Sequence, residues 1–211
     1  MSHAIDDASD FFDTLGEDAL PANSQKPHER GDAAFDSPLR TSGYFVWSLP
    51  RSPRHVLMDG WHSSGILVRQ SGQPYTIGST IDINEDGNFT DRPIGTAGLS
   101  SHSATPDKRV RLVVTEPLAQ WAYPQVADRT QDEIGRNTFR AIGLFDADLA
   151  VYRDFVVHDR THFTIRWDSF NVLNRAQFGI PVRLLEAPGF GVSTHTMLPS
   201  RVMQLGVKAS F

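Results

Sequence analysis

The last eleven residues of the chain, 201–211, alternate strictly between two kinds of side chain. Every second position is apolar, and the positions between are polar or glycine; the apolar set is Met203, Leu205, Val207, Ala209 and Phe211. Successive side chains of a β-strand point to opposite faces, so residues 200–211 predict a strand with one apolar and one polar face. An ordinary amphipathic strand would show the same alternation, and that alternative stays open here.

The same segment resembles the closing strand of a bacterial outer-membrane β-barrel. Such strands often carry a polar residue, a glycine two places later, and apolar residues at the third-last and last positions. Gln204, Gly206, Ala209 and Phe211 fit that arrangement. The resemblance implies two partners, which are outer-membrane lipid and the barrel-assembly machinery that binds a C-terminal strand.

Composition is compatible with such a barrel. Hydrophobic residues make up 39% of the 211 residues, and no apolar run approaches the roughly 18 residues of a transmembrane helix. Barrel strands dilute their apolar residues by alternation, so low hydropathy does not argue against a membrane location. The absence of cysteine excludes disulfides, thiolate metal sites and cysteine nucleophiles. The net charge of -5 is concentrated before residue 37 and no basic block occurs, so we expect no nucleic-acid partner.

Alternation recurs along the chain and predicts five strands, at 38–49, 61–77, 140–156, 161–174 and 200–211. The segment 161–174 is the clearest case, because Phe163, Ile165 and Trp167 share one face opposite Arg166 and Asp168. Segment 61–77 is rich in strand-forming residues but alternates poorly. In segment 140–156 the odd positions are apolar, with Arg153 as the exception.

The connections between these strands alternate in length. Those at 50–60 and 158–160 are short, whereas those at 6–36, 78–140 and 175–199 are long. Transmembrane barrels have short periplasmic turns and long extracellular loops. The predicted fold class is therefore all-β, an antiparallel meander of about five or six strands forming part of a transmembrane outer-membrane β-barrel. Residues 1–36 are expected to hold a strand end and an acidic extracellular loop, and residues 37–211 the C-terminal barrel strands.

Several phrases, in order, resemble the C-terminal barrel of Oar-like TonB-dependent transporters, the group with a carboxypeptidase-regulatory-like N-terminal domain. They include Glu29-Arg-Gly31, Phe45-Val-Trp-Ser-Leu-Pro50, Gln70-Ser-Gly-Gln-Pro-Tyr-Thr76, Asp82-Ile-Asn-Glu-Asp-Gly-Asn88, Gly135-Arg-Asn137 and Phe170-Asn-Val-Leu-Asn174. The resemblance implies an outer-membrane location and energised import through a plugged barrel of roughly 22 strands. The chain matches only the last strands of that family, and the first residues show no secretory signal. We therefore expect a fragment that depends on a missing N-terminal barrel and plug, and on TonB only through the full-length protein.

One loop carries a candidate calcium site. Asp82, Asn84 and Asp86 occupy alternate positions before a glycine, an arrangement that turns oxygen ligands toward one hard cation. Asn88 and Asp91 could complete the set. The twelfth position of an EF-hand would hold a bidentate glutamate but here holds proline, so that ligand set is incomplete. A polar loop in which Asp and Asn merely favour turns is the alternative.

No residue is predicted to be catalytic, and no enzyme activity is expected. The eight histidines are scattered, and no nucleophile elbow, phosphate loop or dinucleotide fingerprint occurs. Asp146, Asp148 and Asp168 are expected to line a lumen. Trp47, Trp61 and Trp167 are expected to face lipid, the first two in an interfacial girdle. The competing class is a secreted or surface β-sandwich that binds calcium or carbohydrate; a soluble hydrolase has no motif in support.

Overall fold

The computed structural model describes residues 2–6, 30–49, 59–80, 92, 99–102, 111–114, 135–158 and 161–211. Regular structure in these ranges consists of β-strands, and none of them contains a helix long and apolar enough to cross a membrane. The chain divides into two compact units. The sheet unit comprises Arg40–Gln70, Leu144–Ala176 and Leu198–Phe211, and the loop unit comprises Met1–Leu39, Ser71–Gly143 and Gln177–Met197.

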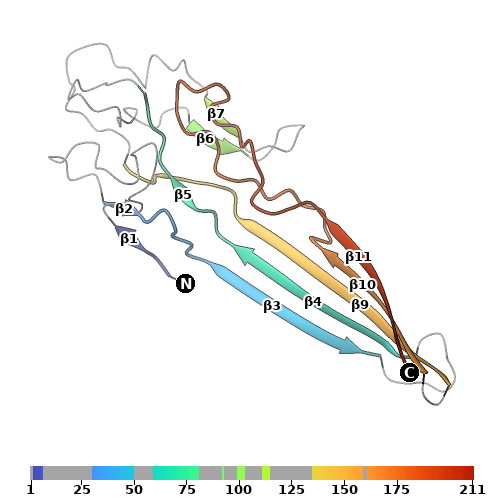
Figure 1. The fold of residues 1–211 in the computed structure, drawn as a ribbon. Helices are drawn as coiled ribbons and strands as arrows, with labels where there is room; N and C mark the ends of the chain where they lie inside the picture. Colours follow the sequence, from blue (N-terminus) through green and yellow to red (C-terminus); the bar gives the residue numbers. More distant parts are fainter. Residues whose placement is uncertain are drawn as a thin grey trace, which may run out of the picture. The chain divides into compact units, whose positions relative to one another are not determined.

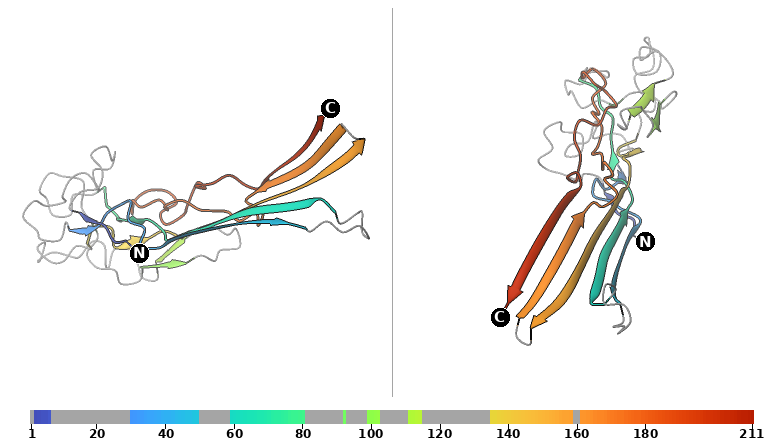
Figure 2. Two further views of the ribbon diagram at one scale, coloured as in Figure 1. Left: turned by 90° about the horizontal axis from the view of Figure 1, so that it is seen from below. Right: turned by 90° about the vertical axis from the view of Figure 1, so that its right-hand side faces the viewer.

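The sheet unit is built from five long strands (Figures 1 and 2). They are β3 (Arg40–Ser48), β4 (Trp61–Gln70), β9 (Leu144–His158), β10 (Thr161–Phe170) and β11 (Val202–Ser210). Their order in the sheet is β11-β10-β9-β4-β3, and every pair is antiparallel. Each long strand therefore lies beside its neighbour along the chain. The predicted antiparallel meander is confirmed.

Three predicted strands extend too far. β4 ends at Gln70, β9 begins at Leu144, and β10 ends at Phe170. At the last of these, Asn171 and Asn174 adopt positive φ angles of 49° and 50°, which break the extended backbone. The Asn171 side chain then donates to the carbonyls of Arg175 and Pro199. These polar bonds hold the turn that ends the strand.

The stretch after β4 belongs to the loop unit, where short strands replace the predicted extension. β5 (Pro74–Tyr75) pairs with β8 (Phe139–Arg140). A Cβ on Gly72 would lie 1.7 Å from the carbonyl oxygen of Ala141, so only glycine permits the backbones to approach here. This close crossing separates the predicted segments 61–77 and 140–156 into two pieces each.

The loop unit contains a small core. Tyr75, Ile77 and Leu185 are buried, with Phe139, Ala141, Ile180 and Phe190 packed against them. Two further strand pairs are β1 (Ile5–Asp6) with β2 (Gly31–Asp32), and β6 (Leu99–His102) with β7 (Arg111–Val114). The connections predicted as long loops thus include folded structure in their described parts.

Candidate functional site: the two faces of the sheet

The pairing register assigns each side chain of the sheet unit to one of two faces. Ile165 lies opposite Val207 and Arg153, and Trp167 lies opposite Leu205 and Val151. We call this side the apolar face; its large apolar residues are Phe45, Trp47, Trp61, Leu67, Phe145, Leu149, Val151, Phe155, Phe163, Ile165, Trp167, Met203, Leu205 and Val207. Cross-strand partners therefore join into an apolar surface, which Arg69 and Arg153 interrupt.

The apolar face remains uncovered in the sheet unit. Leu205 is 74% exposed, Val207 67% and Met203 56%. A soluble monomer seldom exposes a contiguous apolar patch larger than a few hundred Å². Such a surface is suited to contact with hydrocarbon, where exposed apolar side chains carry no hydration cost. Phe211 lies beyond β11, so the strand register does not fix its direction.

The opposite side of the sheet, which we call the hollow face, carries Arg166, Asp168, Gln204 and Lys208. The predicted separation of these residues from Phe163, Ile165, Trp167, Met203, Leu205 and Val207 is confirmed. Asp146 and Asp148 also lie on the hollow face, opposite Val68 and Ile66. Charged residues are thus kept on one side through the middle of the sheet.

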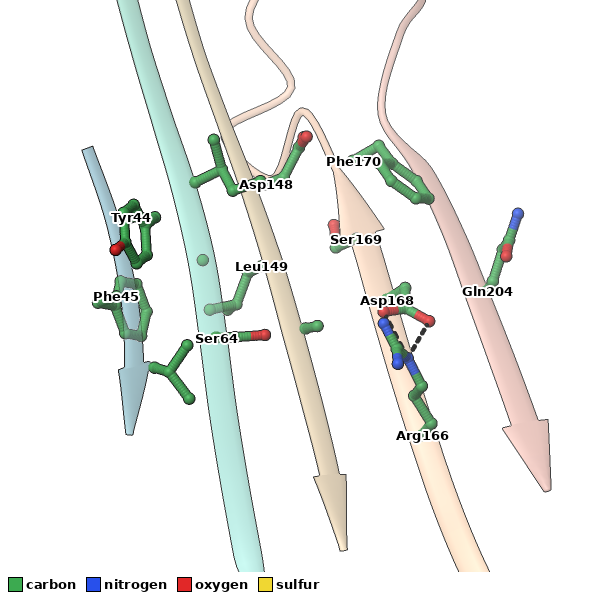
Figure 3. Close-up of a pocket in the computed structure, with 14 residues that line it drawn as sticks. Tyr44, Phe45, Ser64, Asp148, Leu149, Arg166, Asp168, Ser169, Phe170 and Gln204 are labelled. Atoms are coloured by element: carbon green, nitrogen blue, oxygen red, sulfur yellow. Dashed lines mark hydrogen bonds and ion pairs between the residues drawn. The ribbon is translucent and has the colours of Figure 1, made fainter. Parts of the chain in front are cut away.

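A hollow of about 570 Å³ lies on this face (Figure 3). Its lining includes Tyr44, Ile66, Asp148, Phe170 and Gln204. The Nε of Arg166 donates to both carboxylate oxygens of Asp168, at 2.9 and 2.8 Å. Asp148 accepts a 2.9 Å bond from the backbone N–H of Asn171. The hollow therefore combines fixed charges with aromatic surface.

The hollow face also carries apolar side chains along the edge strand β3 and its neighbour β4. Tyr44 is 85% exposed, Val46 73% and Ile66 54%, and all three lie on this face. The sequence signal was the unbroken run Tyr44-Phe-Val-Trp47, which places apolar residues on both sides of β3. Apolar side chains exposed on the hollow face are stabilised when another apolar surface covers them.

A serine, a histidine and an aspartate also come together on the hollow face, although they are distant in sequence. Ser48 Oγ lies 2.8 Å from His62 Nδ1, and His62 stacks on Tyr152 with ring centroids 4.6 Å apart. Asp154 is 3.9 Å from the other ring nitrogen, too far for a hydrogen bond, and accepts one from Thr164 at 2.7 Å. The carboxylate thus does not orient the imidazole as a catalytic triad requires. These contacts join strands rather than assemble a nucleophile.

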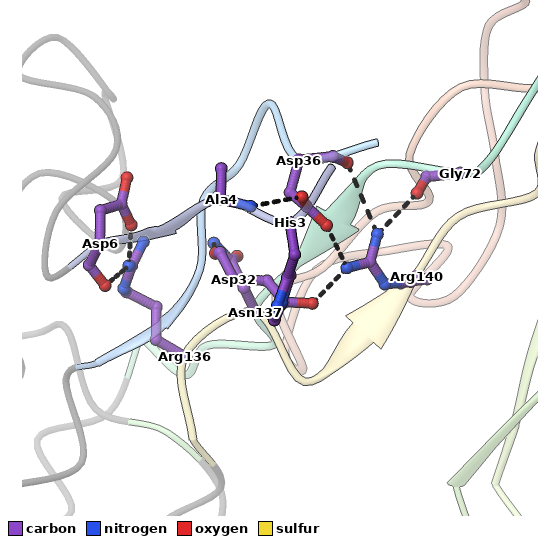
Figure 4. A network of polar contacts seen from close by, with 9 residues as sticks. All are labelled: His3, Ala4, Asp6, Asp32, Asp36, Gly72, Arg136, Asn137 and Arg140. Atoms are coloured by element: carbon purple, nitrogen blue, oxygen red, sulfur yellow. Dashed lines mark hydrogen bonds and ion pairs between the residues drawn. The ribbon is translucent and has the colours of Figure 1, made fainter. Parts of the chain in front are cut away.

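The loop unit holds a separate polar cluster around Arg140 (Figure 4). The guanidinium pairs with Asp32 and with Asp36, the latter at 2.5 Å, and also donates to the carbonyl of Gly72 at 3.2 Å. His3 Nε2 lies 2.7 Å from Asp32. His3, Asp32 and Asp36 are close enough together to hold a metal ion. Arg140, however, already supplies the positive charge that a cation would bring to these carboxylates.

This cluster shifts the pKa of its carboxyls. Burial opposes ionisation of Asp36, yet the Ala4 N–H and Arg140 outweigh it and hold the pKa below its ordinary value. The hydrogen bond from His3, together with Arg140, lowers the pKa of Asp32 despite partial burial. Both aspartates therefore remain ionised as partners of Arg140.

Of the other predicted site residues, the calcium set Asp82, Asn84, Asp86, Asn88 and Asp91 lies outside the described residues. In β11, Gln204 and Gly206 lie on the hollow face and Ala209 on the apolar face. β11 is an edge strand of the five-stranded sheet, so its outer backbone groups have no partner strand within it. That β11 closes a barrel stays a prediction.

Comparison with known families decides between the remaining classes. Residues 1–204 match the family model described as an outer membrane beta barrel domain. The chain belongs to this family. It is an all-β protein of the outer membrane. The match and the uncovered apolar face leave no support for a secreted β-sandwich. Neither a search of curated proteins nor a search of solved structures gave a match.

Proposed function

We propose that this chain is a C-terminal portion of the barrel of an Oar-like TonB-dependent transporter, and that it contributes wall and lumen surface to energised uptake without catalysis. The observation that supports a plugged barrel is the apolar patch formed by Tyr44, Val46 and Ile66 on the hollow face. A water-filled channel has a polar lining. An apolar lumen patch is instead stabilised when a folded plug covers it.

The hollow also has a lining that suits protein contact. Aromatic Tyr44 and Phe170 line the same hollow as the Arg166–Asp168 pair and Gln204. Protein–protein contacts commonly combine aromatic residues and arginine with a small number of fixed polar groups. This mixture favours a plug segment, with side chains of its own, over a column of mobile water.

The number and direction of strands support dependence on a larger barrel. Closed membrane barrels begin at about eight strands, and the sheet unit contains five. Because five antiparallel strands are an odd number, the edge strands β3 and β11 run in the same direction. If a second copy with the same orientation in the membrane joined the sheet, its β3 would pair with β11 in parallel. Antiparallel closure requires an odd number of further strands, which we assign to the missing N-terminal barrel.

Cross-linking in outer membranes tests this assignment, and the lack of cysteine makes single-site labels possible. Tyr44→Cys carrying a photoactivated cross-linker should form an adduct with a plug-containing polypeptide. The matched Leu205→Cys, on the apolar face, should form adducts with lipid only. Loss of TonB should change the rate at which a membrane-impermeant thiol reagent labels Tyr44→Cys. Rapid labelling of Tyr44→Cys without any protein adduct would show an open lumen and contradict the proposal.

A further inference from the structure

One cation interrupts the apolar face near the end of the sheet that has the short connections. Arg153 lies directly opposite Trp61 in β4 and Ile165 in β10, so the register places it among the lipid-facing residues. Its guanidinium lies over two aromatic rings, 4.6 Å from the centroid of Phe155 and 5.5 Å from that of Trp61. The Nε donates to the carbonyl of Asp59 at 3.0 Å. The Arg153 guanidinium is thus held on the apolar face by two aromatic rings and one backbone carbonyl.

The position of Arg153 along the strands matches a membrane border. Its partner Trp61 is eight residues from Arg69, the other arginine that the register places on the apolar face of β4 and β9. Eight residues span about 26 Å along a strand, or about 20 Å along the membrane normal at a tilt of about 40°. The apolar band of outer-membrane barrels is about 25 Å tall, and long arginine side chains can reach the remaining distance.

Between these two arginines, the apolar face of β4 and β9 carries no charge. The intervening residues are Ser63, Gly65, Leu67, Ala147, Leu149 and Val151. A charge within this band would face hydrocarbon at a cost of about 2–4 kcal/mol at mid-bilayer. Two arginines at its limits therefore lie where the surroundings change from hydrocarbon to headgroups. Short connections are periplasmic in such barrels, which assigns Arg153 to the inner leaflet.

We propose that Arg153, with Trp61 and Phe155 as its walls, binds the phosphate group of a phospholipid in the inner leaflet of the outer membrane. A guanidinium stacked on aromatic rings presents its N–H edge, and that edge matches a phosphate. Trp61 sits at the depth where amphipathic aromatic rings are favoured. In this arrangement both rings contact the upper acyl chain. This assignment rests on the outer-membrane location and does not depend on transport by TonB.

The test uses the full chain, extracted from outer membranes in mild detergent, with bound lipid counted by native mass spectrometry. Arg153→Gln should retain about fivefold less phospholipid than the wild type, the effect of removing one cation from a lipid surface. Arg153→Lys should retain an intermediate amount, because it keeps the charge but loses the planar donor edge. Arg40→Gln, which removes a cation from the hollow face, should retain the wild-type amount.

Exchange experiments on the wild type identify the source of the phosphate and do not depend on any variant folding. A phospholipid added to the detergent should occupy the site, whereas a sugar-headed diacylglycerol with the same acyl chains should not. Inorganic phosphate should fail to displace the bound phospholipid. Equal retention by Arg153→Gln and the wild type, equal binding of the sugar-headed lipid, or displacement by inorganic phosphate would each overturn the proposal.

Discussion

The two units of this chain are stabilised by different surroundings. In the sheet unit, every residue of β3 and β11 is exposed, and the sheet has one face of uncovered apolar side chains. In the loop unit, Tyr75 and Ile77 are buried in a small core and Asp36 is buried in an ion-paired cluster. The small core and the Arg140 cluster of the loop unit therefore have their partners within that unit, whereas the apolar side chains of the sheet unit stay exposed.

This difference predicts the surroundings in which a substitution in each unit should change stability. A charge placed on the apolar face should matter only when lipid is present, because no protein layer in the sheet unit covers that face. A change in the Arg140 cluster should matter in water, because its partners lie within the loop unit. Four substitutions or conditions test the contrast.

The largest effect is expected from Leu205→Arg in the middle of β11. The new charge would face hydrocarbon, and we expect a loss of about 2–4 kcal/mol in the free energy of unfolding from the membrane. Gln204→Arg is the matched control, because residue 204 lies on the hollow face of the same strand. Denaturant titration of membrane-inserted protein measures both. Similar losses for the two variants would mean that the faces are not distinct.

A smaller effect is expected from Arg140→Gln in the loop unit. Asp36 would lose its ion-pair partner while its side chain stays 1% exposed, and we expect a local loss of about 1–3 kcal/mol. Amide hydrogen exchange over residues 30–39 and 135–143 should accelerate, while exchange in β10 and β11 stays unchanged. Arg40→Gln serves as the control for loss of a cation. Acceleration throughout the sheet would contradict the separation of the two units.

Acidification should loosen the loop unit in the same region. The folded-state pKa values of Asp32 and Asp36 lie below the ordinary value of 3.8. Their contribution to stability is therefore present above pH 3.8 and is lost as the pH falls through the lower folded-state values. Cleavage of the loop unit by pepsin should rise over this window in the wild type, and less steeply in Arg140→Gln. An identical pH response in both proteins would show that Arg140 does not cause the acid sensitivity of the loop unit.

The smallest effect is expected from Arg166→Gln. Arg166 Nε donates to both carboxylate oxygens of Asp168, at 2.9 and 2.8 Å, but the Arg166 side chain is 56% exposed. Exposed ion pairs contribute little to stability. The unfolding midpoint of the inserted protein should match that of the wild type, and binding of a plug segment should weaken instead. A clear loss of barrel stability would contradict this prediction. It would mean that the Arg166–Asp168 pair is shielded from water.

Alternation in the sequence predicted the two faces of β10 and β11 correctly, because nearly every position in those strands carries a side chain suited to its face. β4 was harder to predict, and Gly65 shows why. A Cβ at this position would lie 2.5 Å from Phe45 Cε1, so the ring of the neighbouring strand supplies the apolar surface that residue 65 lacks. The sequence periodicity of β4 alone cannot show that a side chain of β3 covers its glycine.

The ends of the strands and the polar cluster of the loop unit also escaped prediction. β10 ends through the positive φ angles of two asparagines, and the predicted segment 61–77 is divided where the backbone of Gly72 meets that of Ala141. Arg140 and its partner Asp32 are more than a hundred residues apart. No periodic pattern links residues at that separation, so their pairing depends on tertiary structure alone. The calcium set at 82–91 stays a prediction.

We expect the apolar face of the sheet unit to contact lipid and the hollow face to be shielded from it. Nitroxide labels placed on single cysteines through residues 202–210, one variant at a time, test it directly in outer membranes. Labels at 203, 205 and 207 should be relaxed by oxygen, which concentrates in hydrocarbon, and labels at 204, 206 and 208 should not. Oxygen accessibility without a two-residue period along β11 would contradict the account.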